Sequence, residues 1–416
     1  MKKSLIALAA LAAVSAASAQ TSGLTISGYI DRGYVNANNT NAQASSKQIG
    51  SNAGTTAIFF KGTEDLGGGL AAGFSVETDF APLDGNTQAS SYSAAQNAGF
   101  ANGESFASLA SANLGTLKLG APNSFMLGIA TGVAAPSLST GVGSAYSSSF
   151  SIFNGIGTGT TGNGGVGVKA TNGTGVTAAN NTAAAAIGGP QYTVGQVLGT
   201  AGARDIRINN TIQYVSPTFS GFSAGFSYTP QNNNVAFANN SGTGNMVGVN
   251  EYVLNYANGP LKVAFDSVKY SVGSNGTGQL TATTSSTVAA TTSKLDVGLT
   301  STHNLLAASY AVLPQLTVNA GFGSFSSSDS LSKGNSQQFG ATYVIGAFDL
   351  MAVYAKVNDS SASNIDRKMF GLGANYNLSK TARAYVRYDS INYASNQAAY
   401  VGSELKRTAV GVSKSF

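Results

Sequence analysis

Cysteine and tryptophan are absent from this sequence, and charged residues are scarce. Without cysteine, neither a disulfide nor a thiolate metal site can hold the fold together. Only 9% of the residues are charged, against roughly 25% in an ordinary soluble domain. A soluble fold of this length would need more surface charge. The fold must therefore rest on backbone pairing and packing.

Long apolar runs are missing beyond the first residues. Lys2 and Lys3 precede an apolar run at 5–14 and small residues ending at Ala19, the layout of a secretory signal peptide. We expect residues 1–19 to be a cleaved signal peptide, whose loss lowers the formal charge from +5 to +3. No later stretch approaches the about 20 apolar residues of a membrane-spanning helix. The chain 20–416 is thus predicted to be exported without a helical anchor.

Histidine occurs once, at His303. Without cysteine, a nucleophile motif or a histidine cluster, a Ser-His catalytic site or a metal site has little support. We predict that the protein is not an enzyme and binds no metal, cofactor or nucleic acid. His303 is interpreted as a polar residue at the start of a strand, and a lipase that uses it is the less favoured alternative.

Apolar and polar residues alternate with a period of two along most of the chain. In 316–322, for example, Leu316, Val318 and Phe322 share one face, while Thr317 and Asn319 lie on the other. Segments of about 10 residues with this pattern are typical of strands with lipid outside and water inside. A β-sandwich would alternate as well, so the pattern alone does not decide between the two.

The connections between these strands alternate between short and long. Short turns are predicted at 66–69, 113–116, 217–221, 257–260, 312–315, 345–347 and 377–380. Eight longer segments lie between them, the first at 38–54 and the third at 121–205. Seven short and eight long connections join 16 strands, an even number that closes without an edge in lipid. We predict an all-β fold, a 16-stranded antiparallel transmembrane β-barrel with short periplasmic turns and long external loops.

The third long connection, 121–205, carries almost no charge. A structureless segment of this length is uncommon and is usually functional or disordered. We favour the interpretation that part of it folds into the lumen and narrows it. The alternative is a low-complexity insertion on the surface.

Several segments are similar to motifs of one known family. They are GLTISGYIDRGYV at 23–35, KGTEDLGGGLAAGFSVETDF at 61–80, ASLASANLGTLKLG at 107–120, NNTIQYVSPTFSGFSAGFSY at 209–228, LSKTARAYVRYD at 378–389 and AVGVSKSF at 409–416. The chain resembles the general outer-membrane porins of β-proteobacteria and neisseriae. The resemblance implies a homotrimer in outer-membrane lipid that passes small hydrophilic solutes and ions. Phe416 resembles the signal read by the barrel-assembly machinery, although Lys414 stands where many such proteins carry an aromatic residue.

The residues that line such a channel follow from the parity of each strand. If the apolar face meets lipid, the other face meets water. The predicted pore-lining residues are Asp31, Lys61, Glu77, Asp79, Lys118, Arg207, Lys262, Asp266, Arg383, Tyr385, Arg387, Asp389 and Arg407, with Asp349 also facing inward. A cluster of cations on one wall, facing acids elsewhere, would set a transverse field in the lumen.

Selectivity is expected to be weak. Ala57, Glu104 and Ala121 stand where the resembled family commonly carries basic residues, and the third loop lacks the usual opposing acids. We therefore expect a general diffusion channel that slightly prefers anions. Two alternatives stay open: a substrate-specific channel of the same fold, and a surface β-solenoid or adhesin, which should show one fixed repeat period.

Arg32 breaks the alternation, because parity places it on the outer face with Ile26 and Ile30. An arginine that faces lipid at mid-membrane depth costs about 2–4 kcal/mol. Three positions would lower this cost: near a rim, beyond a bulge, or in a contact between subunits.

Overall fold

The computed structural model describes most of the barrel and parts of its connections. The described residues are 22–39, 44–79, 101, 103–136, 138–145, 167–171, 191–193, 210–232, 247–272, 279–281, 292–295, 300–327, 333–360, 365–395 and 404–416. The expected signal peptide at 1–19 and Arg207 lie outside them.

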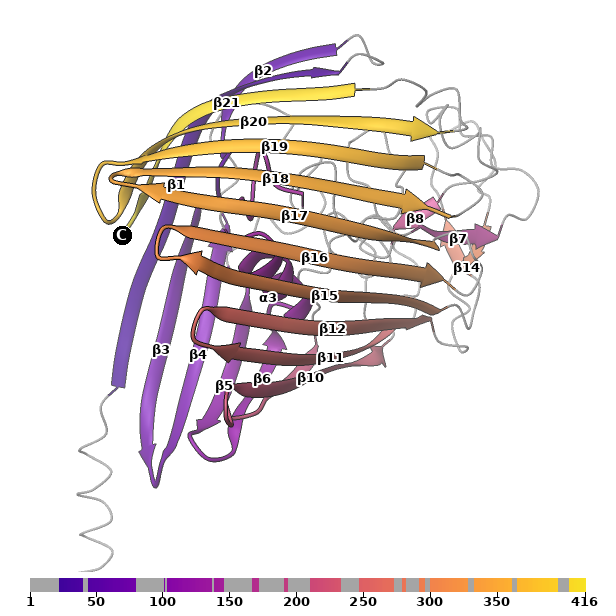
Figure 1. Ribbon diagram of the computed structural model, residues 1–416. Coiled ribbons are helices and arrows are strands. Elements are labelled where there is room, and N and C mark those ends of the chain that lie inside the picture. Colours follow the sequence, from indigo (N-terminus) through magenta and orange to yellow (C-terminus); the bar gives the residue numbers. More distant parts are fainter. Residues whose placement is uncertain are drawn as a thin grey trace, which may run out of the picture.

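The strands form one closed antiparallel ring (Figure 1). They are β1 (Ser22–Asn39), β2 (Ala44–Gly50), β3 (Ala57–Gly67), β4 (Leu70–Asp79), β5 (Ser105–Ser111), β6 (Gly115–Ala121), β9 (Thr211–Val215), β10 (Phe222–Asn232), β11 (Val247–Asn258), β12 (Leu261–Val272), β15 (Thr300–Leu313), β16 (Leu316–Ser327), β17 (Lys333–Ile345), β18 (Phe348–Asp359), β19 (Ile365–Asn377), β20 (Ala382–Ser395) and β21 (Glu404–Ser415). β1 pairs with both β2 and β3, each strand from β3 onward pairs with the next strand of the ring, and β21 pairs with β1 to close it. From β3 onward each strand of the ring has a paired neighbour on both sides, as a barrel in lipid requires.

The 17 segments of this sheet make 16 strands, because β2 and β3 are two pieces of one strand. Both pair with β1, β3 along 22–29 and β2 along 33–39. Residues 51–56 leave the wall between them. The prediction that the first long loop spans 38–54 was therefore wrong in its extent, because β2 lies within that range. Because β2 carries polar residues on both of its faces, its sequence does not show the alternation of apolar and polar residues.

All seven predicted short turns lie where the structure connects strands. The turn from β3 to β4 shows how the sequence makes one of them: Gly67, Gly68 and Gly69 have φ angles of 79°, 63° and 80°. Only glycine adopts this left-handed region without a steric penalty. The three consecutive glycines therefore fix a tight reversal at the periplasmic end.

The outer face of the ring is apolar. Large exposed hydrophobic side chains alternate along the strands, as with Leu306 on β15, Phe322 on β16 and Phe339 on β17. They lie side by side across the strands, and the Phe322 and Phe339 rings meet edge to face at 5.6 Å between centroids. An apolar band of this kind suits contact with lipid chains. No helix among the described residues is long and apolar enough to cross a bilayer.

Four short strands lie apart from the ring, at the end opposite to the short turns (Figure 1). They are β7 (Gly167–Thr171), β8 (Gln191–Thr193), β13 (Gln279–Thr281) and β14 (Thr292–Leu295). β14 pairs with β7, so this small sheet joins the third long connection to the one that precedes β15.

Candidate functional site: the lumen of the barrel

The third connection enters the lumen directly after β6. Two polar side chains hold its start: Glu104, directly before β5, accepts the Asn123 backbone N–H at 2.9 Å, and Gln213 on β9 donates to the Asn123 carbonyl at 3.0 Å. Glu251, almost fully buried on β11, accepts the backbone N–H of Met126 at 2.9 Å. These contacts carry the loop from β5 and β6 across to β11.

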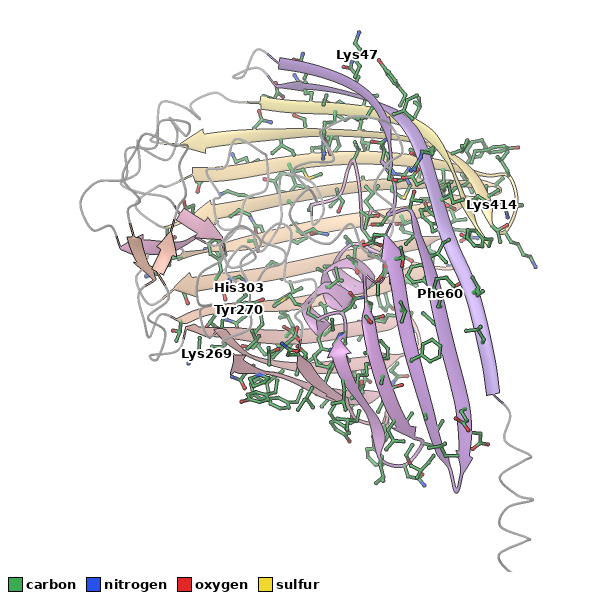
Figure 2. The ribbon with its side chains drawn as sticks, turned by 180° about the vertical axis from the view of Figure 1, so that it is seen from behind. Lys47, Phe60, Lys269, Tyr270, His303 and Lys414 are labelled. Atoms are coloured by element: carbon green, nitrogen blue, oxygen red, sulfur yellow. The ribbon has the colours of Figure 1, made fainter. Side chains whose placement is uncertain are left out.

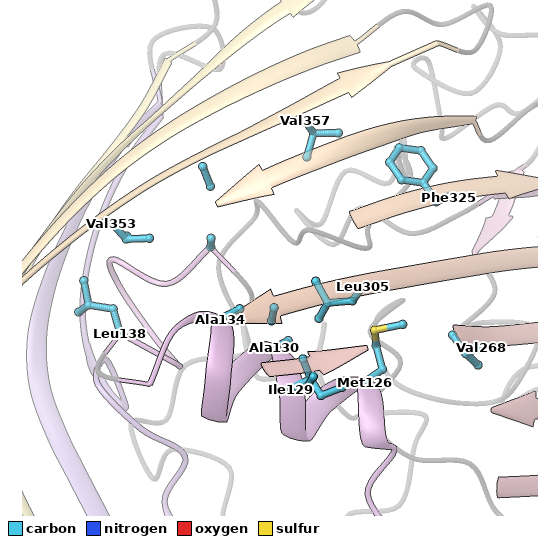
Figure 3. Packing of buried hydrophobic residues seen from close by; sticks show 14 of the residues in the cluster. Met126, Ile129, Ala130, Ala134, Leu138, Val268, Leu305, Phe325, Val353 and Val357 are labelled. Atoms are coloured by element: carbon cyan, nitrogen blue, oxygen red, sulfur yellow. The ribbon is translucent and has the colours of Figure 1, made fainter. Parts of the chain in front are cut away.

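A short helical segment, α3 (Phe125–Ile129) followed by the π-helical turn η2 (Ala130–Ala134), lies inside the ring (Figure 1). Ser124 caps it, because its hydroxyl oxygen accepts the Leu127 backbone N–H at 3.1 Å. The buried side of the helix packs on apolar residues that the inner wall presents, among them Val268 and Leu305 (Figure 3). Here the wall serves as a packing surface for the loop.

Amide side chains on β16 and β17 fix the end of η2. Asn319 and Gln338 both donate to the carbonyl oxygen of Ala134, Gln338 at 2.9 Å. Both amides are buried. They satisfy a carbonyl that the end of the helix leaves without an intrahelical partner.

The last described part of the loop, 138–145, reaches the far wall. The Gly143 backbone N–H donates to Asp389 on β20 at 2.7 Å. The Val142 N–H donates to the Asn52 carbonyl at 2.8 Å, and the Thr140 hydroxyl to the Ala53 carbonyl at 3.0 Å. The described loop thus runs across the lumen from β6 to β20 and to the break between β2 and β3. The prediction that part of the third loop folds into the lumen is confirmed for this segment.

Glycines in the wall make room for this crossing. A Cβ at Gly371 would lie 2.5 Å from the Gly143 carbonyl oxygen, and one at Gly225 would lie 2.5 Å from the Phe125 ring. A larger residue at either position would push the loop away from the wall. The small inward residues of the strands are therefore needed for the close approach.

Asp31 organises the break in the second strand. Its carboxylate is fully buried and accepts the backbone N–H groups of Asn52, Ala53 and Gly54 at 2.6, 2.6 and 2.9 Å. The Tyr385 hydroxyl donates to its other oxygen at 2.6 Å. Consecutive N–H groups turned toward one oxygen form an anion-binding nest. Asp31 therefore holds residues 51–56 folded inward, where they receive the end of the third loop.

Three arginines follow one face of the last two strands, and most of their donors are engaged. Arg407 binds Asp389 through Nε at 3.0 Å and Nη2 at 2.5 Å. Arg387 is 2% exposed, donates to Asn375 at 2.7 Å and lies over the Tyr385 ring. Arg383 donates to the Tyr29 hydroxyl at 2.8 Å and to Ser413 at 3.0 Å. The acids Asp31 and Asp389 lie on the same wall as these arginines, not across from them.

Burial divides the predicted pore-lining residues into two groups. Asp31, Glu77, Asp266, Tyr385, Arg387 and Asp389 are buried. Lys61 and Lys262 are exposed, and Asp79, Lys118, Arg383 and Arg407 are half-buried. The Lys61 ammonium lies over the Phe59 ring at 5.6 Å, and that of Lys118 over the Phe106 ring at 4.7 Å. Their role in permeation stays a prediction.

The residues that hold the loop were missed by sequence reasoning. The alternation along each strand predicts that four of these residues face inward: Gln213, Glu251, Asn319 and Gln338. Their partners are backbone groups 90 to 204 residues away, which no local pattern indicates. Glu104, noted as a departure from the resembled family, is also one of these anchors.

Two residues that stood out in the sequence have local explanations. Arg32 lies beside the break in the second strand, and its guanidinium donates to Ser51 at 3.1 Å, to Thr56 at 3.0 Å and to the Asp31 carbonyl. His303 is buried on the inward face near the start of β15, next to Tyr270, with ring centroids 5.7 Å apart (Figure 2). In the described part of the chain, no group of three or more His, Cys, Asp or Glu residues could hold a metal ion.

Known proteins share this architecture. The chain is 31% identical over 273 residues to outer membrane porin protein 32 of Delftia acidovorans, a match that covers 64% of this chain and 58% of that relative. Among solved structures, an anion-selective porin from Comamonas acidovorans superposes with a TM-score of 0.65 at 22% identity, covering 95% of this chain and 100% of that one. The trimer form of OmpT of Vibrio cholerae gives 0.58 at 12% identity, with 95% and 100% covered. The structural likenesses establish the fold.

A family model described as Gram-negative porin matches residues 7–396, nearly the whole chain. Together with the closed barrel, this match places the protein in the outer membrane. The chain belongs to the Gram-negative porin family.

Proposed function

We propose that this protein is a general diffusion porin, a water-filled channel for small hydrophilic solutes and ions with a weak preference for anions. One observation supports the proposed preference for anions. The inward cations Lys61, Lys118, Lys262, Arg383 and Arg407 stay at least partly exposed, whereas Asp31, Glu77, Asp266 and Asp389 are buried. Of the predicted inward acids, Asp79 and Asp349 are half-buried.

Fixed charges on the wall of a narrow aqueous channel raise the local concentration of ions of the opposite sign. The described loop segments at 121–136 and 138–145 contain no charged residue, so the strands supply the field. Because Asp389 forms a salt bridge with Arg407 at 2.5 Å, that arginine adds little net charge, and the net positive field is expected to be modest.

The comparisons support this proposal without deciding it. One structural neighbour is described as an anion-selective porin, and another is described in a trimer form. By analogy we propose a homotrimer. The family and the fold point to a channel rather than an enzyme, and diffusion through a channel requires no cofactor.

Assembly is proposed to depend on the C-terminus. Phe416 exchanges two backbone hydrogen bonds with Gly28, at 2.9 and 3.1 Å, so the last residue completes the seam between β21 and β1. Its ring lies over Gly28, where a Cβ would lie 2.2 Å from the ring. We propose that the barrel-assembly machinery recognises this exposed terminal phenylalanine.

Liposome swelling tests the proposal. Purified, folded protein in liposomes should admit uncharged sugars at rates that fall smoothly as the sugars grow. One sugar entering far faster than its size predicts would favour the substrate-specific channel. Absence of swelling, with the folded barrel verified by its altered electrophoretic mobility before heating, would contradict a diffusion channel.

A further inference from the structure

Two pairs of lysine and phenylalanine lie close together on the inner wall between β3 and β6. The Lys61 ammonium is 5.6 Å from the centroid of the Phe59 ring on the same strand, and the Lys118 ammonium on β6 is 4.7 Å from that of Phe106 on β5. The strands β3, β4, β5 and β6 are consecutive neighbours in the ring (Figure 1). We name these four residues, together with Ser75 on β4, the lysine–phenylalanine site.

Ser75 lies between the two pairs. It is directly opposite Lys61 on β3 and directly opposite Phe106 on β5, so these three residues form one row across the wall. Lys118 belongs to the next row, because it is opposite Ser108, two residues from Phe106. Neighbouring strands are about 4.8 Å apart, so β3 and β5 are separated by about 10 Å. Two contacts of about 3.5–4.0 Å fit in this interval, which leaves room for one aromatic ring between the side chains of β3 and β5.

The ammonium groups of both lysines have donors to offer to an anion. Among the described residues, neither Lys61 nor Lys118 donates a hydrogen bond or forms an ion pair. The arginine on the neighbouring part of the wall differs, since Arg383 donates to Tyr29 and to Ser413. The two lysines are therefore better placed than this arginine to bind a solute.

Ser75 adds a hydroxyl group between the two ammonium groups. Its side chain is buried, and within the described part of the chain its oxygen has no hydrogen-bond partner. A buried polar group without a partner is destabilising, and native proteins usually supply one. The acid Glu77, opposite Phe59, is buried, and its carboxylate accepts the Glu104 backbone N–H at 2.8 Å. An anion held between the lysines would give the Ser75 hydroxyl an acceptor.

We propose that the lysine–phenylalanine site binds aromatic carboxylates as they pass through the channel. The two ammonium groups and the Ser75 hydroxyl bind the carboxylate, and the rings of Phe59 and Phe106 pack against the aromatic ring of the solute. Positive charge alone attracts any small anion, whereas aromatic contacts add affinity beyond the burial of apolar area. The inference rests on the proposed diffusion channel and names the class of solute that it retains longest.

Block of the chloride current in planar bilayers tests the proposal. Benzoate and cyclohexanecarboxylate are matched probes, because they have the same charge and nearly the same size and only benzoate is aromatic. Both are ionised at about pH 7. In the wild-type channel, benzoate should reach half-block at an about threefold lower concentration than cyclohexanecarboxylate, because its ring makes aromatic contacts.

Variants locate the site. K61Q should raise the half-blocking concentration of benzoate about fivefold, through the loss of one ammonium–carboxylate pair. K262Q is the matched control: it removes the same charge from another exposed inward lysine and should leave that concentration unchanged. The variant F59L/F106L keeps both lysines and should remove the difference between the two probes.

Equal half-blocking concentrations of the two probes in the wild-type channel, or no block by either, would overturn the proposal, and this arm needs no variant. An equal loss of benzoate affinity in K61Q and K262Q would also overturn it, because the block would then come from the general positive field. Currents in potassium chloride alone separate the two levels. Open channels that prefer chloride but do not distinguish the probes contradict only the aromatic site, whereas absent channels contradict the diffusion channel and the site with it.

Discussion

The two halves of the inner wall differ in what their side chains do. From β11 to β19 the wall presents buried apolar residues, such as Val253, Leu305 and Met351, and buried amides that hold the third loop. From β3 to β6 it presents the lysines Lys61 and Lys118, which remain at least partly exposed. The first part of the wall mainly packs against the third loop, although Lys262 on β12 is exposed, and the second carries lysines that stay at least partly exposed.

This difference separates stability from selectivity. On the packing side, inward residues are fixed by contacts with the loop, so their replacement should change folding and the shape of the channel together. On the charged side, inward residues stand beside water, where substitutions usually change stability by about 0.5 kcal/mol or less. Substitutions on the two sides should therefore have separable effects.

The largest effect is expected for Asp389→Ala on β20. The change removes the acceptor for Arg407 and for the Gly143 backbone N–H. Breaking a buried charge pair from one side costs about 3 kcal/mol or more, because the remaining charge is left unpaired. Denaturant unfolding in detergent should show this loss. The freed Arg407 should also raise the preference for anions, and unchanged stability would argue that Asp389 does not anchor the loop.

Gly371→Leu should have an intermediate effect. The new side chain would meet the Gly143 carbonyl at 2.5 Å and Val353 at 2.8 Å, so the loop end must move. Overpacking of this kind costs about 1–3 kcal/mol. Single-channel recordings should show an altered conductance as well. Gly23→Leu is the control, since a Cβ there meets nothing within 4 Å; similar changes in both variants would mean that contact with the loop is not the cause.

The smallest effect on stability is expected for Lys61→Gln combined with Lys118→Gln. Both lysines make cation–π contacts with phenylalanines, and such contacts are worth about 0.5–1 kcal/mol each at exposed sites. The unfolding free energy should therefore fall by at most about 2 kcal/mol. Selectivity should change more clearly, with the ratio of chloride to potassium permeability falling toward one. An unchanged ratio would remove these lysines from the permeation path.

The sequence predicted the barrel because each spanning strand repeats one simple pattern. Lipid on one side and a polar interior on the other impose the alternation seen around Phe322, and glycine and proline mark the turns. The pattern failed at β2, because Ile49 is the only large apolar residue in Ala44–Gly50 and a single residue shows no alternation.

The candidate site was less predictable for a different reason. Parity identified Asp31 and Tyr385 as inward residues, but their hydrogen bond joins groups 354 residues apart in the chain. Parity placed both Arg387 and Lys61 on the inward face but could not predict their burial. Arg387 is buried and donates to Asn375, whereas Lys61 is exposed. Burial inside the lumen depends on where the loop lies, and only the folded structure contains that information.

Reversal potentials of the wild-type protein in planar bilayers, recorded across a gradient of potassium chloride, test the central claim most directly. A partly exposed lumen surface dominated by Lys61, Lys118 and Lys262 predicts open channels with a modest preference for chloride. A clear preference for potassium, or the absence of channels in folded protein, would contradict it.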